Sequence, residues 1–271
     1  MDLMLGSTTR PWNAFTFAQA CASIAAAGYP EVAVFSHEGK IPVNSETTAE
    51  EAAAVARTAA AAGLKPTMLI SGVRLDLPLE EAVADHRRLI DACAVLGART
   101  RSGAPWPMDC GTEDASQYEK YHEIMRQSAP YAESKGAALT MKPHGGIGLT
   151  GKMIVEVVRA VNHPNFSLCY DPGNIIYYTK GELRPETDVD EVLGHVGTCI
   201  IKDCIVIDGK PDVWILPGEG WVDFHVVLGK LTAGGFTGPL YVECLGGSEL
   251  ADIDDRAQRT RDYLGGIIGK L

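Results

Sequence analysis

Charged side chains stand at the ends of short apolar runs in the second half of the chain. Lys142 follows the run 138–141, Asp171 follows 166–170, Lys202 follows 198–201 and Glu243 follows 240–242. Apolar runs of this length are typical of buried strands. Carboxylates can remove or return protons, and an ammonium group can stabilise an oxyanion, so these residue types suit proton transfer next to a carbonyl. The pattern indicates an enzyme.

Helix-like and strand-like segments alternate along the chain and must position these side chains. Helical stretches end at Gly28, Gly63 and Gly136, and an apolar run follows each, as expected where a glycine adopts the left-handed conformation that ends a helix. Thr48 and Glu51 form a capping box, which predicts a helix that begins near Thr48. Strand alternating with helix predicts a parallel sheet.

About eight strands are expected, which is the number that closes a barrel. They lie near residues 3–6, 31–35, 66–70, 98–102, 138–142, 166–171, 198–203 and 239–243. The alternative, an open doubly wound sheet, is disfavoured because the first strand-to-helix connection, residues 6–12, has no Gly-x-Gly-x-x-Gly motif. We therefore predict an α/β fold, a single (β/α)₈ TIM barrel over residues 1–271, with charge on its catalytic face and no nucleotide cofactor.

One insertion interrupts the alternation after the seventh strand. Asp208-Gly209 is a hairpin signal between the apolar runs 205–207 and 213–215. The predicted hairpin lies on the catalytic face, where it could act as a rim or partial lid. Trp214 and Trp221 would then offer apolar surface to a sugar ring or a neighbouring subunit, or would pack under the hairpin itself.

Composition excludes several classes of function. The formal net charge of −11 works against nucleic-acid binding, which needs clustered Lys and Arg. The chain has no apolar run of about 20 residues that could cross a bilayer, and its first residues do not resemble a signal peptide, so a cytoplasmic location is expected. The seven cysteines form no Cys-x-x-Cys pair and are expected to be reduced residues of the core.

Five segments of the C-terminal half, in order, resemble the sugar phosphate isomerase/epimerase, or xylose isomerase-like, TIM-barrel superfamily. They are Lys142-Pro143-His144, Tyr170-Asp171-Pro172-Gly173-Asn174, Ile201-Lys202-Asp203, the run 217–224 (PGEGWVDF) and the run 235–243 (GFTGPLYVE). The N-terminal half fits the superfamily in architecture only. Members are often dimers or tetramers, and no feature of the sequence itself indicates an oligomer.

The resemblance implies a divalent metal, commonly Mn²⁺, Mg²⁺ or Zn²⁺, held by two Glu, an Asp and a His at strand ends. Asp171 and Glu243 occupy two of the ligand positions, but Lys142 stands where a Glu is usual and Ile200 where a His is usual. A protonated amine cannot ligate a metal. Two alternatives stay open: a shifted metal site of Asp171 and Glu243 with His144 or Asp203, or the Lys142 ammonium in the metal's electrostatic place.

The candidate site residues take their roles from this arrangement. Glu243 is the expected base, His144 the acid or second base, and Lys142, or a metal near Asp171, the oxyanion stabiliser. The residues expected to bind substrate are Arg101 beyond the fourth strand, Asn174, Lys202, and His37 after the second strand.

The expected partner is a small-molecule carbohydrate or keto-sugar, phosphorylated or free. The leading hypothesis is an isomerase or epimerase that shifts a proton next to a carbonyl through an enediolate. A lyase or dehydratase is the second, either by elimination from a 3-keto-glycoside or by an aldolase-like Schiff base on Lys142. The third is a noncatalytic sugar-binding barrel, since two ligands are missing.

Overall fold

The computed structural model describes residues 3–97 and 105–271, and in these residues eight parallel strands close into a barrel. Neighbours around the barrel follow the order β1-β10-β7-β6-β5-β4-β3-β2. The strands are β1 (Leu5–Thr8), β2 (Glu31–Val34), β3 (Lys65–Ile70), β4 (Trp106–Asp109), β5 (Leu139–Met141), β6 (Phe166–Tyr170), β7 (Val196–Ile201) and β10 (Leu240–Val242). The predicted TIM barrel is confirmed.

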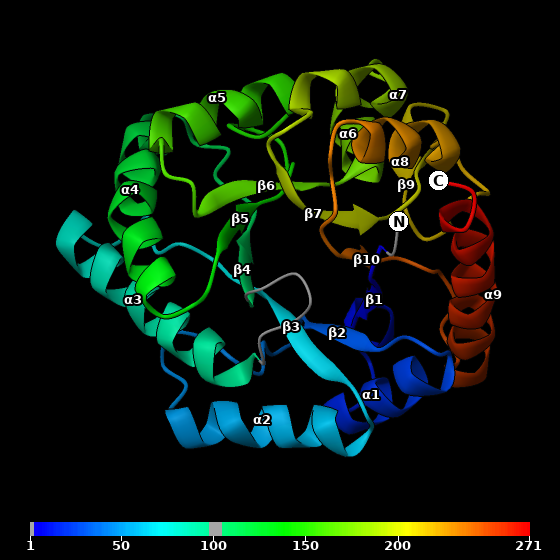
Figure 1. The fold of residues 1–271 in the computed structure, drawn as a ribbon, viewed down its shortest axis with the longest axis horizontal. Helices are drawn as coiled ribbons and strands as arrows, with labels where there is room; N and C mark the ends of the chain where they lie inside the picture. The colour runs from blue at the N-terminus through cyan, green and yellow to red at the C-terminus, as the bar shows by residue number, and fades with distance from the viewer. Residues whose placement is uncertain (1–2, 98–104) are drawn as a thin grey trace.

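Helices between the strands form an outer ring around the barrel (Figure 1). They are α1 (Phe17–Ala26), α2 (Ala49–Ala61), α3 (Leu79–Leu96), α4 (Tyr118–Ser134), α5 (Gly151–Val161), α6 (Pro172–Thr179), α7 (Pro185–Asp188), α8 (Phe224–Ala233) and α9 (Leu250–Ile268). Short 3₁₀ turns span Arg10–Trp12, Ala115–Gln117 and Val189–Val192. The capping box of Thr48 and Glu51 opens α2 as predicted.

Alternate residues of the strands fill the barrel interior. Cys169 of β6, Ile200 of β7 and Tyr241 of β10 belong to one buried cluster with side chains of β2, β3 and β4. Because side chains on one face of a strand recur every second residue, the residues two positions further along, Asp171, Lys202 and Glu243, continue the same inward-facing rows. The barrel alternation therefore carries the charged residues to one end of the interior.

The fourth strand differs from the prediction. It was expected at residues 98–102 and is instead Trp106–Asp109, which pairs with β3 through Met68 and Trp106 and with β5 through Met108 and Thr140. Pro107 lowers the strand propensity of this segment, but pairing on both sides overrides that preference. Arg101, expected beyond the fourth strand, precedes β4 in the sequence and lies outside the described residues.

The hairpin insertion after β7 is confirmed. Strand β8 (Ile205–Ile207) pairs antiparallel with β9 (Lys210–Asp212). Asp208 and Gly209 both have positive φ, 49° and 73°, as a two-residue type I′ turn requires. That short turn places the second arm three residues earlier than the predicted 213–215.

Asp203 connects this hairpin segment to the barrel. One carboxylate oxygen accepts the backbone N–H groups of Cys204 and Val222 at 2.8 and 3.0 Å. The other accepts those of Gly218 and Gly220 at 2.8 and 2.9 Å. A buried carboxylate with four such donors is fully satisfied, so Asp203 fixes the segment that follows the hairpin.

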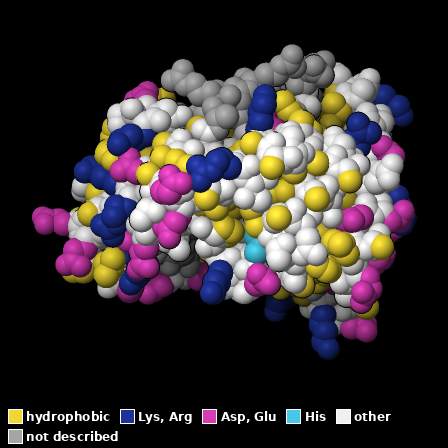
Figure 2. All heavy atoms as spheres, turned by 90° about the horizontal axis from the view of Figure 1, so that it is seen from below, with side chains coloured by type: hydrophobic (Ala, Val, Ile, Leu, Met, Phe, Trp, Pro, Cys, Tyr) yellow, Lys and Arg dark blue, Asp and Glu magenta, His cyan; other side chains and the backbone are white. Residues whose placement is uncertain are grey.

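Three further features concern the helices, the surface charges and the cysteines. In the described residues, no helix combines the length and apolar character needed to span a bilayer. Basic and acidic side chains are interspersed on the face seen in Figure 2. All seven cysteines are free, and each except Cys110 is buried.

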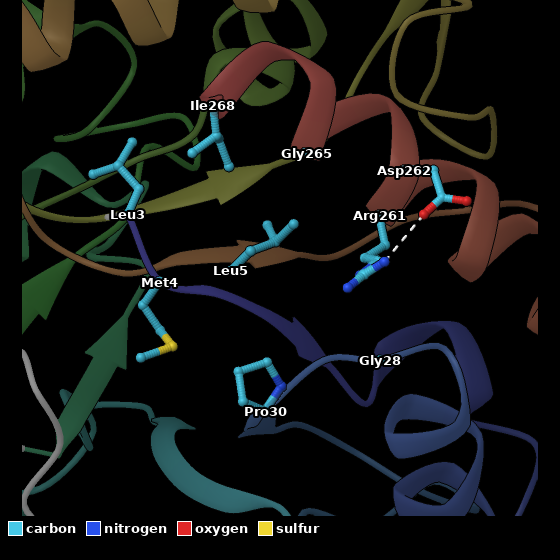
Figure 3. A pocket seen from close by; sticks show the side chains of 9 residues that line it. All are labelled: Leu3, Met4, Leu5, Gly28, Pro30, Arg261, Asp262, Gly265 and Ile268. Atoms are coloured by element: carbon cyan, nitrogen blue, oxygen red, sulfur yellow. Dashed lines mark hydrogen bonds and ion pairs between the residues drawn. The ribbon is translucent and has the colours of Figure 1, made fainter. Parts of the chain in front are cut away.

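A cavity of about 540 Å³ lies at the N-terminal ends of β1 and β2, against α9 (Figure 3). Of its lining residues, Arg261 and Asp262 are the ionisable ones, and they pair with each other at 3.2 Å. This end of a TIM barrel is usually associated with stability and the opposite end with chemistry. The functional site is therefore expected at the C-terminal ends of the strands.

The buried His86 of α3 is expected to make the stability of the protein depend on pH. Burial lowers the pKa of His86 to about 4, from an ordinary value near 6.5. The unfolded chain therefore binds a proton at pH 5 that the folded chain does not, so the free energy of unfolding falls as pH drops below 6.5. This contribution amounts to about 2 kcal/mol between pH 7 and pH 5.

We expect His86→Gln to remove that part of the pH dependence in urea unfolding measured at pH 7 and pH 5. His225→Gln, at an exposed position of α8, is the matched control and should fall with pH as the wild type does. An equal fall in wild type and His86→Gln would contradict the assignment.

Candidate functional site

A cluster of two lysines and two carboxylates closes the C-terminal end of the barrel interior. Lys142 Nζ lies 2.7 Å from Glu243 Oε2 and 3.6 Å from Asp171 Oδ2. Lys202 Nζ lies 2.8 Å from Asp171 Oδ2 and 3.4 Å from Glu243 Oε1. All four side chains are at most 4% exposed, so each ion is paired in a site from which most water is excluded.

The start of α6 holds the Asp171 carboxylate in place. Asp171 is the N-cap of α6, and its Oδ1 accepts the Asn174 backbone N–H at 3.0 Å while Oδ2 faces the lysines. The Asn174 side chain donates in turn to the Pro143 carbonyl at 2.5 Å, which ties α6 to the loop after β5. Hydrogen bonds with backbone groups therefore fix both Asp171 and the loop after β5.

Charge pairing sets the protonation states. Burial alone would raise the pKa of Glu243, but Lys142, Lys202 and Arg10 outweigh it and hold that pKa well below its usual range. Burial alone would lower the pKa of Lys142, but Glu243 and the other groups around it raise that pKa above its ordinary value. Glu243 is therefore an anion and Lys142 a cation at neutral pH.

Above the cluster lies a cavity of about 290 Å³, near the lower end of the range for small-molecule sites. Its lining residues come from the barrel, from α6 and from the hairpin region. They are Arg10, Lys142, His144, Asn174, Tyr177, Tyr178, Lys202, Pro211, Asp212, Val213, Trp214 and Glu243. The hairpin thus forms part of the wall, and Trp214 lines the cavity while remaining 46% exposed.

His144 enters this cavity from the loop after β5. Its ring centroid lies 4.8 Å from that of Tyr178. Burial first, and then the charges of Lys142 and Lys202, lower the pKa of His144 below its ordinary value, and Asp171 and Glu243 offset this only in part. His144 is therefore neutral near pH 7, and one ring nitrogen is free to accept a proton.

The structure brings together Lys142, His144, Asn174, Lys202 and Glu243 around one cavity, with Asp171 directly below. It does not bring His37 or Asp203 there. His37 is buried with its Nδ1 3.3 Å from the Phe15 carbonyl oxygen, and both oxygens of Asp203 accept N–H groups of the hairpin segment. Arg101 lies outside the described residues.

Sequence reasoning missed Arg10, Tyr177 and Tyr178. Arg10 opens the turn after β1, and its Nη1 lies 3.5 Å from Glu243 Oε1. Arg10 comes soon after the first strand, as Lys142 comes after β5, but β1 (LGST) is not a clear apolar run and the sequence predicts strand 1 two residues too early. The two tyrosines lie on α6, which begins at the recognised Asp-Pro-Gly-Asn segment.

The residues present do not fit a divalent metal in this arrangement. Ammonium groups already contact both carboxylates, and at the position of the usual His ligand Ile200 is part of the apolar barrel interior. Within residues 3–97 and 105–271, no group of three or more His, Cys, Asp or Glu side chains is placed to hold a metal ion.

Comparison with known proteins places this fold in a family. A family model described as xylose isomerase-like TIM barrel matches residues 21–264. The chain belongs to the xylose isomerase-like TIM barrel family. The resemblance seen in the C-terminal half therefore extends over most of the chain.

A protein of named activity is similar to part of this chain. The inosose dehydratase of Serratia proteamaculans is 23% identical over 163 residues, or 55% of this chain and 54% of that protein. The chain thus spans about half the length of the curated relatives it matches.

Solved structures share the fold at low identity. A D-psicose 3-epimerase from Clostridium cellulolyticum, solved with D-tagatose, has a TM-score of 0.76 at 14% identity, with 98% of this chain and 99% of that one covered. A xylose isomerase-like TIM barrel protein from Mycobacterium smegmatis, solved in complex with magnesium, has a TM-score of 0.73 at 16% identity, with 93% and 89% covered. Epimerases, a dehydratase and a magnesium complex therefore all occur among the relatives of this chain.

The charge balance of the cluster predicts unequal effects on stability. Glu243→Gln leaves three cations facing the single carboxylate of Asp171, whereas Lys142→Met leaves Lys202 and Arg10 balanced by two carboxylates. Breaking a buried pair by removing one partner typically costs about 3–5 kcal/mol.

We expect Glu243→Gln to lower the free energy of unfolding by about 3 kcal/mol or more, and Lys142→Met by less than half of that amount. Urea denaturation at pH 7 measures both. If Lys142→Met proves the more destabilising of the two, the description of this cluster as cation-rich is wrong.

Proposed function

We propose that the protein is an isomerase or epimerase that shifts a proton next to a carbonyl of a carbohydrate through an enediolate. One observation carries the proposal: two buried ammonium groups, each held by a buried carboxylate, face a cavity that also contains a neutral histidine. Ammonium groups fixed in a water-poor site stabilise the negative charge that develops on the carbonyl oxygen during enolisation. Epimerases among the structural relatives support this reaction class.

In the proposed mechanism the substrate carbonyl oxygen lies against Lys142 and Lys202. A base removes the proton from the carbon next to the carbonyl, and the electron pair of that C–H bond forms the enediolate, whose oxyanion the ammonium groups stabilise. An acid then returns a proton to the same carbon from the other side, or to the former carbonyl carbon. Isomerisation differs from epimerisation in this last step, and it also requires a proton to pass from the neighbouring hydroxyl oxygen to the former carbonyl oxygen.

His144 and Glu243 are the proposed proton-transfer groups. They come from the ends of β5 and β10, which are separated around the barrel by β6 and β7, so they can approach a substrate from different sides. His144 is the better base in the resting site because it is neutral, whereas contact with three cations weakens Glu243 as a base. Glu243 can act once the substrate draws the ammonium groups away from it.

A dehydratase is the second candidate, and the match to inosose dehydratases favours it. The same enolate would expel a hydroxyl group from the β carbon, with His144 as the acid that protonates it. The Schiff-base version is disfavoured because the raised pKa of Lys142 keeps its amine protonated and therefore not nucleophilic.

The function is tested by incubation with ketoses, sugar phosphates and 3-keto-sugars in D₂O, followed by NMR. We expect deuterium uptake next to the carbonyl that EDTA does not abolish, because ammonium groups supply the positive charge. Lys142→Met should slow uptake by about 10²–10³-fold, and Lys152→Met, at an exposed position of α5, should leave it unchanged.

Uptake that EDTA abolishes and Mn²⁺ restores would contradict the lysine-based mechanism. Absence of uptake into every ligand that binds would favour a noncatalytic sugar-binding barrel.

The proposed role of His144 in proton transfer predicts that its substitution lowers the rate of deuterium uptake. Removal of a general acid or base lowers the rate by about 10²–10⁴-fold, so His144→Asn should reduce deuterium uptake by that factor while the fold is retained. His225→Asn, at the exposed start of α8, is the matched control. If His144→Asn takes up deuterium at the wild-type rate, the role of His144 is wrong and Glu243 alone transfers the proton.

A further inference from the structure

Arg10 joins the buried cluster to the hairpin wall of the cavity. Its Nη1 lies 3.5 Å from Glu243 Oε1, and its guanidinium carbon lies 5.6 Å from the centroid of the Trp214 ring. The side chain is 38% exposed and lines the cavity. Arg10 therefore stands at the entrance, where the buried charges meet the solvent.

Among the described residues, the site holds one more cation than it holds anions. Within this part of the chain, Lys142, Lys202 and Arg10 face the carboxylates of Asp171 and Glu243. His144 adds no charge near pH 7. A further carboxylate, Asp212, lines the cavity, but it is exposed and accepts the Trp214 backbone N–H at 2.8 Å, so water largely screens its charge.

The guanidinium of Arg10 also has unused hydrogen-bonding capacity. Among the described residues, its buried Nε has no hydrogen-bond partner. Its 3.5 Å contact with Glu243 is long for a charge-assisted hydrogen bond, which is usually about 2.7–2.9 Å. A buried N–H donor without a hydrogen-bond partner destabilises the protein unless a ligand accepts a hydrogen bond from it.

We propose that Arg10 binds a carboxylate of the substrate, which makes the substrate class a sugar acid and not a neutral sugar. The Nε and Nη donors of a guanidinium match the two oxygens of a carboxylate, and the single negative charge of that group balances the single excess cation. A phosphate carries more charge than the site can balance. This inference rests on the proposed function, because it concerns the substrate of the same site.

Binding to three matched ketoses tests the inference: D-fructuronate, D-fructose and D-fructose 6-phosphate differ only at carbon 6. Isothermal titration calorimetry at pH 7.5 should show D-fructuronate binding at least tenfold more tightly than D-fructose. Arg10→Gln should remove this preference and leave the affinity for D-fructose within about threefold of wild type. Arg10→Lys keeps the positive charge but lacks the paired N–H donors that match a carboxylate. It should therefore show a preference for D-fructuronate between those of the wild type and Arg10→Gln.

Arg74→Gln is the matched control, because Arg74 is exposed and pairs with Asp76 at 2.7 Å. It should keep the wild-type preference, and circular dichroism checks that each variant is folded. Equal binding of D-fructuronate and D-fructose, a preference that survives in Arg10→Gln, tighter binding of the phosphate, or no binding of any of the three would each overturn the inference.

Deuterium uptake separates this inference from the proposed function. If D-fructuronate binds through Arg10 but takes up no deuterium from D₂O, the carboxylate site stands and the proton-transfer function fails. If neutral ketoses exchange with deuterium and Arg10→Gln changes nothing, the function stands and the role of Arg10 fails.

Discussion

The site depends on the pairing of two buried ammonium groups with two buried carboxylates at the end of the barrel. The two lysines could not remain ionised there without the carboxylates, nor the carboxylates without the lysines, because the desolvation penalty for each ion is several kcal/mol. Together they fix one another's positions, with the amine groups of Lys142 and Lys202 next to a cavity. Burial and the charges of these two lysines keep His144 neutral, and Arg10 adds a further cation beside Glu243.

Barrel geometry is what makes the pairing possible. Asp171, Lys202 and Glu243 each lie two residues beyond an inward-facing residue of a strand. Their side chains therefore enter a common space even though they are far apart in sequence. Asp203, the direct neighbour of Lys202, points the other way and binds four backbone N–H groups of the hairpin segment. One residue of this dipeptide thus belongs to the site and the other to its support.

The sequence predicts the parts of this arrangement that follow from periodicity. Strand parity alone places Lys142, Asp171 and Glu243 on inward-facing rows, and the Asp208-Gly209 signal locates the hairpin. Features set by tertiary pairing were less accessible: β4 contains Pro107 and has little strand character of its own, and this displaced the expected position of Arg101. The role of Arg10 depends on the exact end of β1, and Asp203 could not be told from a ligand without its hydrogen bonds.

The relatives include a protein solved with magnesium. In this protein, lysine ammonium groups contact the carboxylate oxygens that would bind a metal. A crystal structure of protein grown with Mn²⁺, with anomalous data collected at the manganese edge, tests this replacement most directly. The account predicts no anomalous peak between Asp171 and Glu243, and the ammonium groups of Lys142 and Lys202 in contact with both carboxylates. A manganese peak bound by those carboxylates, with the lysines turned away, would contradict it.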